Sequence, residues 1–367
     1  MKDRKKAYSG QKHMLTMINI FLSPLILILF ILTGVAAYFK NMSLGISANI
    51  YLNLLIFYAL ISMAYYLAKI PLEYSSGYML EHKFSLSNQS LKDWMIREVK
   101  KGMIGFIISI PFVFLLYAFI KYWPLYWWAL AGFVWFFMSI LLAKFAPIVI
   151  LPLFYKYSPI GNMELKDRLS RLVREVGVET SGVYEINMSK DTKKANAAVI
   201  GMGKQKRIVL CDTLLKNFSE DEIISVMGHE LGHYKLKHVL KSVLFGGILL
   251  ASIFFLTNIV FLRLHDIVGY TSLLYDFESL VLIYAIISSL SIITLPVHNL
   301  FSRKLEKVAD EFTLKITDNK EAFISTMKKL ADQNLADVDP GKFYEIMLYS
   351  HPPISKRIAF AESFKKR

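Results

Sequence analysis

The amino-acid sequence predicts a mostly α-helical protein that crosses a membrane several times. Of its 367 residues, 54% are hydrophobic and 14% are aromatic. Most of its long apolar runs approach or exceed the roughly 18 residues that a helix needs to cross a bilayer. A large soluble protein does not easily bury so many long apolar helices, so we expect a bundle of membrane spans. Six runs are nearly free of charge: 15–39, 50–68, 103–120, 125–143, 243–262 and 280–295.

The charged residues predict how these spans are oriented. The formal net charge is +14, and the excess Lys and Arg residues lie in the N-terminal tail, in the loop after the second run, in residues 156–237 and from residue 303 onward. The alternate connections hold little more than Lys40, Lys121 and Arg263. Because cytoplasmic loops carry the basic excess, we expect both termini and the segment before the fifth run to face the cytoplasm. This rule accounts for the positive charge without a nucleic-acid partner, and the expected partner is the lipid bilayer.

The order of apolar and polar stretches divides the chain into four regions. No internal repeat or low-complexity stretch divides it further. The expected regions are a membrane region with four spans (1–154), a polar segment (155–238), two further spans (239–300) and a C-terminal helical segment (301–367).

Within the polar segment, helical periodicity over residues 164–176 ends at Gly177, a typical C-cap. Ser219 and the acidic residues after it then begin a second helix, because acids suit the first turn of a helix. Between the two helices we expect three short strands with a hairpin through residues 201–204 joining the last two: 183–188, 197–200 and 207–211.

The helix that begins at Ser219 carries the sequence His229-Glu230-Leu231-Gly232-His233. Two histidines four residues apart on a helix point the same way, so both rings reach one zinc ion at about 2 Å. Glu230 then lies beside the open coordination position, as in a metalloprotease centre. Gly228 and Gly232 add minimal bulk beside the ligands, and we expect them to leave room for the metal and a substrate chain.

A third ligand is available at Glu306, which lies four residues before Asp310 on a predicted helix. Glu306 would bind the metal, and Asp310 would accept a hydrogen bond from a ligand histidine and so fix its ring. The residues alone leave a second interpretation open, in which both acids belong to an ordinary charged helix surface. His238 follows His233 by five residues, about 140° around a continuous helix, so we expect it at the membrane interface and not at the ion.

Several separated motifs, in the same order, resemble those of the type I CAAX prenyl endopeptidases, which are integral-membrane zinc metalloproteases. The motifs are residues 71–84, residues 206–215, the helix with the two histidines, Ser302-Arg303 with Glu306 and Asp310, and Tyr349-Ser350-His351-Pro352-Pro353 with Arg357. The resemblance implies a barrel of six to seven membrane helices around a chamber, and a gluzincin-like zinc metalloprotease domain with a small β-sheet. It also implies one Zn²⁺ ion per chain, held by His229, His233 and Glu306.

The same resemblance assigns roles to residues that the histidine motif does not reach. An extended substrate would lie against an edge strand at Asn196-Ala197, where backbone pairing tolerates many sequences. His351 and Arg357 would face the reacting carbonyl or steady its surroundings. This chain has Ala198-Val199-Ile200 where the family commonly has aromatic residues after the Asn-Ala pair, so we expect the pocket beside the zinc to differ in shape.

The predicted function is zinc-dependent hydrolysis of peptide bonds in peptides or proteins at the cytoplasmic membrane face, with Glu230 as the general base. The first hypothesis is removal of C-terminal residues from prenylated substrates. A second is general quality control of membrane proteins without prenyl specificity. A third, a catalytically silent membrane scaffold, gives no reason to keep Glu230.

Overall fold

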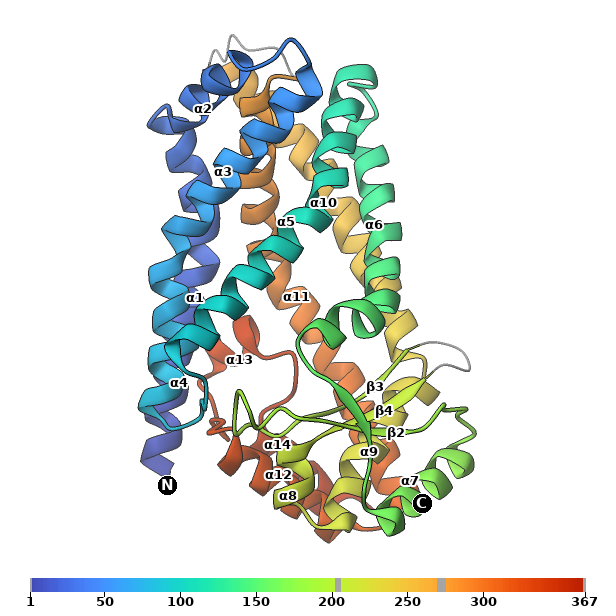
Figure 1. Cartoon of the computed structure of the whole chain (residues 1–367). Helices are drawn as coiled ribbons and strands as arrows, with labels where there is room; N and C mark the ends of the chain where they lie inside the picture. Colours follow the sequence, from blue (N-terminus) through green and yellow to red (C-terminus); the bar gives the residue numbers. More distant parts are fainter. Residues whose placement is uncertain (1, 202–205, 269–274, 366–367) are drawn as a thin grey trace.

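The computed structural model describes residues 2–201, 206–268 and 275–365. Most of these residues are helical, and six of the helical segments described are long and apolar enough to cross a membrane (Figure 1). The candidate spans are Asp3–Leu32, Ile50–Lys83, Leu91–Tyr122, Trp127–Leu153, His238–Leu264 and Phe277–Thr317. The prediction of a mostly helical, polytopic membrane protein is therefore confirmed.

The membrane helices pack on one another in a closed circuit. The helices are α1 (Lys2–Leu32), α3 (Ile50–Glu73), α5 (Leu91–Tyr122), α6 (Trp127–Phe145), α10 (His238–Val268) and α11 (Phe277–Thr317). Along this circuit α1 contacts α3, α3 contacts α5, α5 contacts α6, α6 contacts α10, and α11 contacts both α10 and α1. The expected barrel thus closes with the six long helices of the described chain.

The first apolar run, predicted as one span over residues 15–39, forms two helices instead. α1 ends at Leu32, and Gly34 has a φ of 77°, in the left-handed region that glycine adopts without strain. The next helix, α2 (Val35–Leu44), has 10 residues and is about 15 Å long, so it is too short to cross the membrane again. It packs against α3 and α11.

Short irregular turns connect the membrane helices to the rest of the chain. After α3 come a π-helical turn, η1 (Tyr74–Met79), and a single α-helical turn, α4 (Leu80–Lys83). α5 begins where the Ser90 side chain accepts a hydrogen bond from the backbone N–H of Asp93. α6 continues into η2 (Ala146–Ile150) and η3 (Leu151–Leu153), which lead to the sheet below the membrane helices (Figure 1).

The polar segment forms a four-stranded sheet with the order β1-β2-β4-β3. Its strands are β1 (Tyr157–Pro159), β2 (Val183–Ile186), β3 (Ala197–Ile200) and β4 (Arg207–Cys211). β3 lies at the edge and pairs antiparallel with β4, so that Ala197 is opposite Leu210. The strands predicted at 197–200 and 207–211 have these bounds, whereas the one predicted at 183–188 ends earlier and β1 was not predicted. Residues 202–204 of the predicted hairpin lie outside the described residues.

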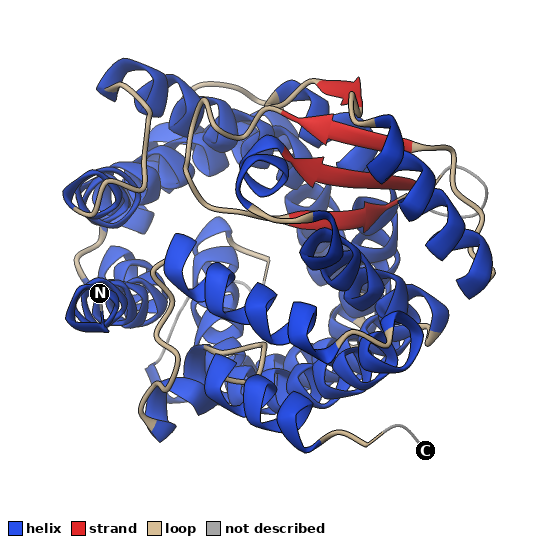
Figure 2. Ribbon diagram, turned by 90° about the horizontal axis from the view of Figure 1, so that it is seen from below, coloured by secondary structure: helices blue, strands red, loops and turns tan. Residues whose placement is uncertain are grey.

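Helices surround the sheet and bury the soluble core. α7 (Met163–Val176) ends at the predicted C-cap Gly177, whose φ is 72°. The other helices are α8 (Asp212–Asn217), α9 (Glu220–Lys235), α12 (Lys320–Gln333), α13 (Lys342–Leu348) and α14 (Ile354–Ser363). The core contains the buried residues Leu169, Ile208, Leu210, Leu214, Met227 and Leu231. Figure 2 shows the strands in one layer at one side of the molecule, with helices around them.

Candidate metal centre

The predicted metal motif lies in the second half of α9, a helix whose start is fixed by its own sequence. The Ser219 hydroxyl accepts a hydrogen bond from the Glu222 backbone N–H, and the Glu222 carboxylate accepts one from the Ser219 N–H. This capping box satisfies two N–H groups that would otherwise have no partner at the helix start. The prediction that the helix begins at Ser219 is confirmed.

The two glycines of the motif allow α9 to pack closely against α11. A Cβ atom at Gly228 would lie 3.1 Å from Cγ2 of Thr313. One at Gly232 would lie 3.0 Å from Phe312 and 3.4 Å from backbone atoms of Ala309. The expected role of these glycines, to leave room for a metal and a substrate chain, is therefore wrong. Their missing side chains instead let α11 approach the histidines.

Glu306 on α11 lies beside both histidines of α9. Its Oε2 atom is 3.0 Å from His229 Nε2, and its Oε1 atom is 3.2 Å from His233 Nε2. The two Nε2 atoms are 3.1 Å apart. The three potential ligand atoms lie within 4.8 Å of one another, so the structure brings together the three residues predicted to bind the metal.

This set of donors fits a metal ion. Oε2 of Glu306 is buried and has no hydrogen-bond partner among the described residues, although His229 is close. The two Nε2 atoms face each other at 3.1 Å, and the unprotonated Nε2 of a neutral histidine is a common metal ligand. Atoms that each lie about 2 Å from one ion in a tetrahedral site are about 3.3 Å apart. The contacts of 3.0 and 3.2 Å match that spacing.

A buried ion pair between Asp310 and Arg357 lies behind His229. Nδ1 of His229 is 2.8 Å from a carboxylate oxygen of Asp310, one turn after Glu306 on α11. Arg357, on α14, donates to both carboxylate oxygens of Asp310 at 2.8 and 2.6 Å. Burial alone would lower the pKa of His229, but Asp310 and Glu306 raise it to about 9. The pair holds the ring with Nε2 toward Glu306.

The two residues expected at the reacting carbonyl lie near the cluster in different surroundings. His351 Nε2 is 3.3 Å from Oε1 of Glu306, and 58% of the His351 side chain is exposed. Arg357 is buried, and its guanidinium is 3.3 Å from His229 Nδ1 in addition to its bonds with Asp310. His351 can therefore contact a bound molecule, whereas Nε and one terminal nitrogen of Arg357 are engaged with Asp310.

Two cavities meet at Glu230. The first, of about 640 Å³, extends between α6, α10 and α11 and is lined by Trp135, Gly246 and Leu250 among others. The second, of about 510 Å³, is lined by Asn196, Ala197, His229, His351 and Arg357 among others. Glu230 lines both cavities. Burial raises the pKa of its carboxyl group, against the opposing effect of the two histidines.

His238 lies closer to His233 than a continuous helix would allow. The sequence interpretation assumed a continuous helix, but α9 ends at Lys235, Lys237 has a φ of 55°, and α10 begins at His238. Nδ1 of His238 consequently lies 3.1 Å from Nδ1 of His233, and the residue is buried. His238 also begins the candidate span His238–Leu264, and its place at the membrane interface stays a prediction. The sequence does not signal this break between α9 and α10, because lysine seldom adopts a positive φ.

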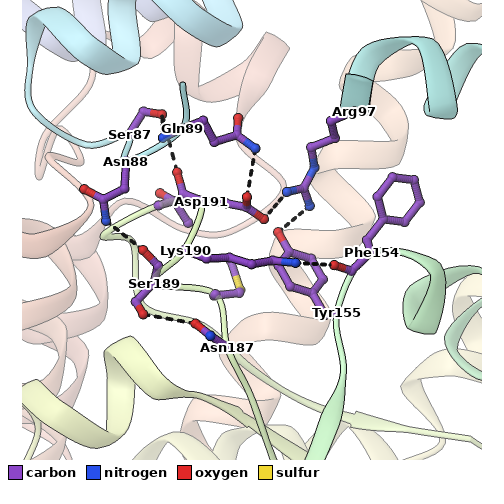
Figure 3. A network of polar contacts seen from close by, with 12 residues as sticks. Ser87, Asn88, Gln89, Arg97, Phe154, Tyr155, Asn187, Ser189, Lys190 and Asp191 are labelled. Atoms are coloured by element: carbon purple, nitrogen blue, oxygen red, sulfur yellow. Dashed lines mark hydrogen bonds and ion pairs between the residues drawn. The ribbon is translucent and has the colours of Figure 1, made fainter. Parts of the chain in front are cut away.

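Residues of the membrane region contact the loop that leads to Asn196 (Figure 3). These contacts were not predicted from the sequence. The carboxylate of Asp191 accepts hydrogen bonds from the Arg97 guanidinium on α5 and, at 2.9 Å, from the Gln89 side chain. The Arg97 guanidinium also donates to the Tyr155 hydroxyl. Arg97 and Asp191 are 94 residues apart in sequence, so no local pattern signals their contact.

The family relationship follows from comparison with known proteins. A profile described as "Peptidase family M48" matches residues 159–365. The chain belongs to peptidase family M48. A second profile, described as "CAAX prenyl protease N-terminal, five membrane helices", matches residues 2–156. In that part of this M48 peptidase, the described residues contain four candidate spans and the short α2. The chain is thus a multi-pass membrane metalloendopeptidase, and the cluster of His229, His233 and Glu306 is available for its metal.

Proteins similar to this M48 peptidase match it over most of its length. The uncharacterized metalloprotease YhfN of Bacillus subtilis is 32% identical over 365 residues, which cover 97% of this chain and 84% of the relative. The CAAX prenyl protease 1 homolog of Arabidopsis thaliana is 28% identical, over 100% of this chain and 88% of the relative. The crystal structure of S. mikatae Ste24p matches with a TM-score of 0.85 and 25% identity, over 98% of this chain and 88% of that one. The resemblance to the CAAX prenyl endopeptidases is confirmed.

Proposed function

We propose that this M48 peptidase is a zinc-dependent endopeptidase of the cytoplasmic membrane face that removes C-terminal residues from prenylated proteins or peptides. The observation that carries the proposal is the position of Glu230. It lines both cavities and lies next to the cluster of His229, His233 and Glu306. A peptide that extends from one cavity into the other must pass this carboxylate. The excess of Lys and Arg in the N-terminal tail, the loop after the second run and residues 156–237 supports the cytoplasmic orientation of the site.

His229, His233 and Glu306 are the proposed ligands of one zinc ion. The ion, when bound, supplies a water molecule whose pKa is lowered to about 7 and polarises the carbonyl of the substrate. Glu230 would accept a proton from the water that attacks the carbonyl carbon. Glu230 then gives the proton to the amine that leaves, so one carboxylate acts as base and as acid.

Three further residues support this chemistry in the proposal. Asp310 accepts a hydrogen bond from His229 Nδ1, which keeps the opposite nitrogen of the ring toward the ion. Arg357 neutralises Asp310 and steadies His229 from behind. His351 donates a hydrogen bond to the oxyanion that forms at the carbonyl, and loss of such a donor typically costs about 100- to 1,000-fold in rate.

The substrate backbone is proposed to pair with the edge at Asn196-Ala197. β3 is the last strand in the order β1-β2-β4-β3, so one side of it carries no strand among the described residues. Asn196, Ala197 and Glu230 line the same cavity. Main-chain pairing with an edge strand gives affinity that depends little on sequence, which suits a peptidase with varied substrates.

The prenylated substrate class is supported by relatives from Arabidopsis thaliana and Caenorhabditis elegans, which are named CAAX prenyl protease 1 homologs. A second candidate function is quality control of membrane proteins without prenyl specificity. It is favoured by the relative in Bacillus subtilis, whose name specifies a metalloprotease and no prenylated substrate. The two functions differ in one measurable property, which is whether cleavage depends on the prenyl group of the substrate.

The test uses the purified protein in detergent with a quenched fluorescent CAAX peptide that is prenylated and with its unprenylated twin. We expect cleavage of the prenylated peptide, loss of cleavage after zinc is removed with a chelator, and its return when zinc is added. Glu230→Gln should abolish cleavage while the zinc content stays that of the wild type. Undiminished cleavage by Glu230→Gln would overturn the mechanism. Equal rates on both peptides would support quality control, and cleavage of neither would support a silent scaffold.

A further inference from the structure

Glu81, on α4, is a buried carboxylate outside the metal centre that joins separate parts of the chain. Only 9% of the residue is exposed. Its side chain accepts hydrogen bonds from the Tyr8 hydroxyl at 2.7 Å and from Lys12 Nζ at 3.0 Å, both on α1. On its other side it pairs with Lys194 Nζ at 2.8 Å. Lys194 lies in the loop that precedes β3, so the carboxylate connects the first membrane helix to the catalytic region.

The main chain of Glu81 is connected to the same loop. The carbonyl oxygen of Glu81 accepts a hydrogen bond from the Leu86 N–H at 2.8 Å. The carbonyl oxygen of Leu86 in turn accepts hydrogen bonds from the Lys193 N–H at 2.9 Å and from the Thr192 hydroxyl at 3.1 Å. One residue of the membrane region thus holds three successive loop residues, two through Leu86 and one through its own carboxylate.

The loop residues held by Glu81 lead directly into the proposed substrate edge, since Ala195 and Asn196 follow Lys194. From the catalytic side, the Thr213 hydroxyl donates to the carbonyl oxygen of Lys194 at 2.8 Å, and the Ala195 N–H donates to the Asn334 side chain at 3.0 Å. The Asp191 network of Figure 3 fixes the loop three residues earlier. Of the loop residues described above that contact the membrane region, Lys194 is the nearest in sequence to Asn196, and its contact is the ion pair with Glu81.

We propose that Glu81 is a positioning residue that, through Lys194, sets the place of the Asn196-Ala197 edge relative to Glu230. A peptide paired with this edge then lies with its scissile bond at the metal centre. The inference rests on the proposed function, because it concerns a peptide bound at this edge. Without the ion pair, the edge is in this place in a smaller fraction of the molecules, so peptide binding weakens. A peptide that does bind pairs with the edge in the same place, so the chemical step stays nearly unchanged.

The first variant is Lys194→Met, because Glu81 then keeps its two partners on α1 and the chain should still fold. We expect the KM for the peptide to rise about tenfold, the effect of losing roughly one charged hydrogen bond, while kcat stays within about twofold. Zinc content should not change. Lys194→Arg, which keeps the positive charge, should restore most of the lost affinity.

Lys40→Met is the matched control. Lys40, on α2, pairs with Asp276 and Glu278. Figure 1 shows α2 at the opposite end of the membrane helices from the edge strand β3. Its loss should lower thermal stability and leave KM unchanged. The Glu81→Gln variant and the double variant Glu81→Gln/Lys194→Met complete a cycle. Lys194 Nζ also donates to the Tyr8 hydroxyl at 2.8 Å, a contact that only Lys194→Met removes. If Glu81 acts through Lys194, the double variant should therefore bind peptide about as weakly as Lys194→Met alone.

The same variants in a Glu230→Gln background measure peptide binding without cleavage, by fluorescence anisotropy of a labelled peptide. An increase of Kd by about tenfold in Lys194→Met supports the inference even if the wild type cleaves nothing, in which case the proposed function alone fails. Unchanged Kd and KM in Lys194→Met, beside active wild-type protein, overturn the inference and leave the function standing. Additive effects of Glu81→Gln and Lys194→Met in the double-mutant cycle also overturn the inference. If no variant binds peptide, the inference and the proposed function are both rejected.

Discussion

Replacing Arg357 by methionine tests whether this residue acts on the metal centre or on the reacting carbonyl. Its guanidinium donates to Asp310 at 2.8 and 2.6 Å and lies 3.3 Å from Nδ1 of His229. Asp310 is 1% exposed, so Arg357→Met leaves a buried carboxylate with His229 as its remaining partner in this cluster. Removing the arginine therefore perturbs the residue that orients a proposed zinc ligand.

Two magnitudes follow from this geometry. Removing one partner of a buried ion pair typically costs about 3–5 kcal/mol, because the other charge stays buried without compensation. Asp310 keeps its contact with His229 at 2.8 Å, so we expect a loss near the lower end, about 3 kcal/mol. Disturbing the group that orients a metal ligand weakens metal binding by about 10- to 100-fold, or about 1.4–2.8 kcal/mol.

The assay for Arg357→Met is competition for zinc between the purified protein and a chromophoric chelator, together with thermal unfolding in detergent. The double variant Arg357→Met/Asp310→Asn is the control, because no unpaired buried charge remains and part of the stability should return. If Arg357→Met binds zinc within about twofold of the wild type and instead loses about 100- to 1,000-fold in kcat, the arginine acts on the oxyanion and our reasoning is refuted.

Two further predictions concern stability at low pH and substrate size. Burial alone would raise the pKa of Glu222, but hydrogen bonds from Lys329 and Ser325 lower it below its ordinary value. Its stabilising contribution is therefore present above the ordinary pKa of about 4.3 and is lost as the pH falls through the lower pKa of the folded state. Thermal unfolding at a series of pH values should show a shallower acid loss of stability in Glu222→Gln, and an unchanged profile would contradict this account. Gly246 lines the 640 Å³ cavity, and a Cβ atom added to it would meet no atom within 4 Å. Gly246→Leu should therefore fill part of this cavity. We expect it to slow the cleavage of peptides with bulky apolar residues more than the cleavage of peptides with small residues. Gly105→Leu, equally open but not among the residues that line this cavity, is its control, and an equal effect of Gly246→Leu on all peptides would count against the cavity as a substrate pocket.

Much of the fold was predictable because the signals are local. The length of an apolar run follows from the thickness of the bilayer, so four of the six predicted runs lie within single candidate spans, and a fifth, 125–143, begins two residues before its span. The first run shows the limit of that signal, since hydropathy does not register the change of direction at Gly34. The capping residues at Ser219 and the C-cap at Gly177 fixed helix ends to within a residue.

The candidate site was predictable in part. The spacing of His229 and His233 is a local property of one helix, so it indicated a metal site directly. Glu306 had an equally plausible interpretation as part of a charged surface until the family resemblance favoured it as a ligand. The surroundings of Arg357 and of His238 were not predictable, because the first depends on the packing of α14 against α11 and the second on a break in the chain at Lys237.

By itself, the sequence determined that this protein is a polytopic membrane protein with two histidines and a carboxylate on one helix, suited to a metal. Only the tertiary structure decided what that helix meets. Because Gly228 and Gly232 have no side chains, α11 packs close to α9, and Glu306 then faces both histidines. The tie between Glu81 and Lys194 was likewise decided by the fold. Contacts between residues more than a hundred positions apart depend on how whole helices pack, and no local pattern of residues records that packing.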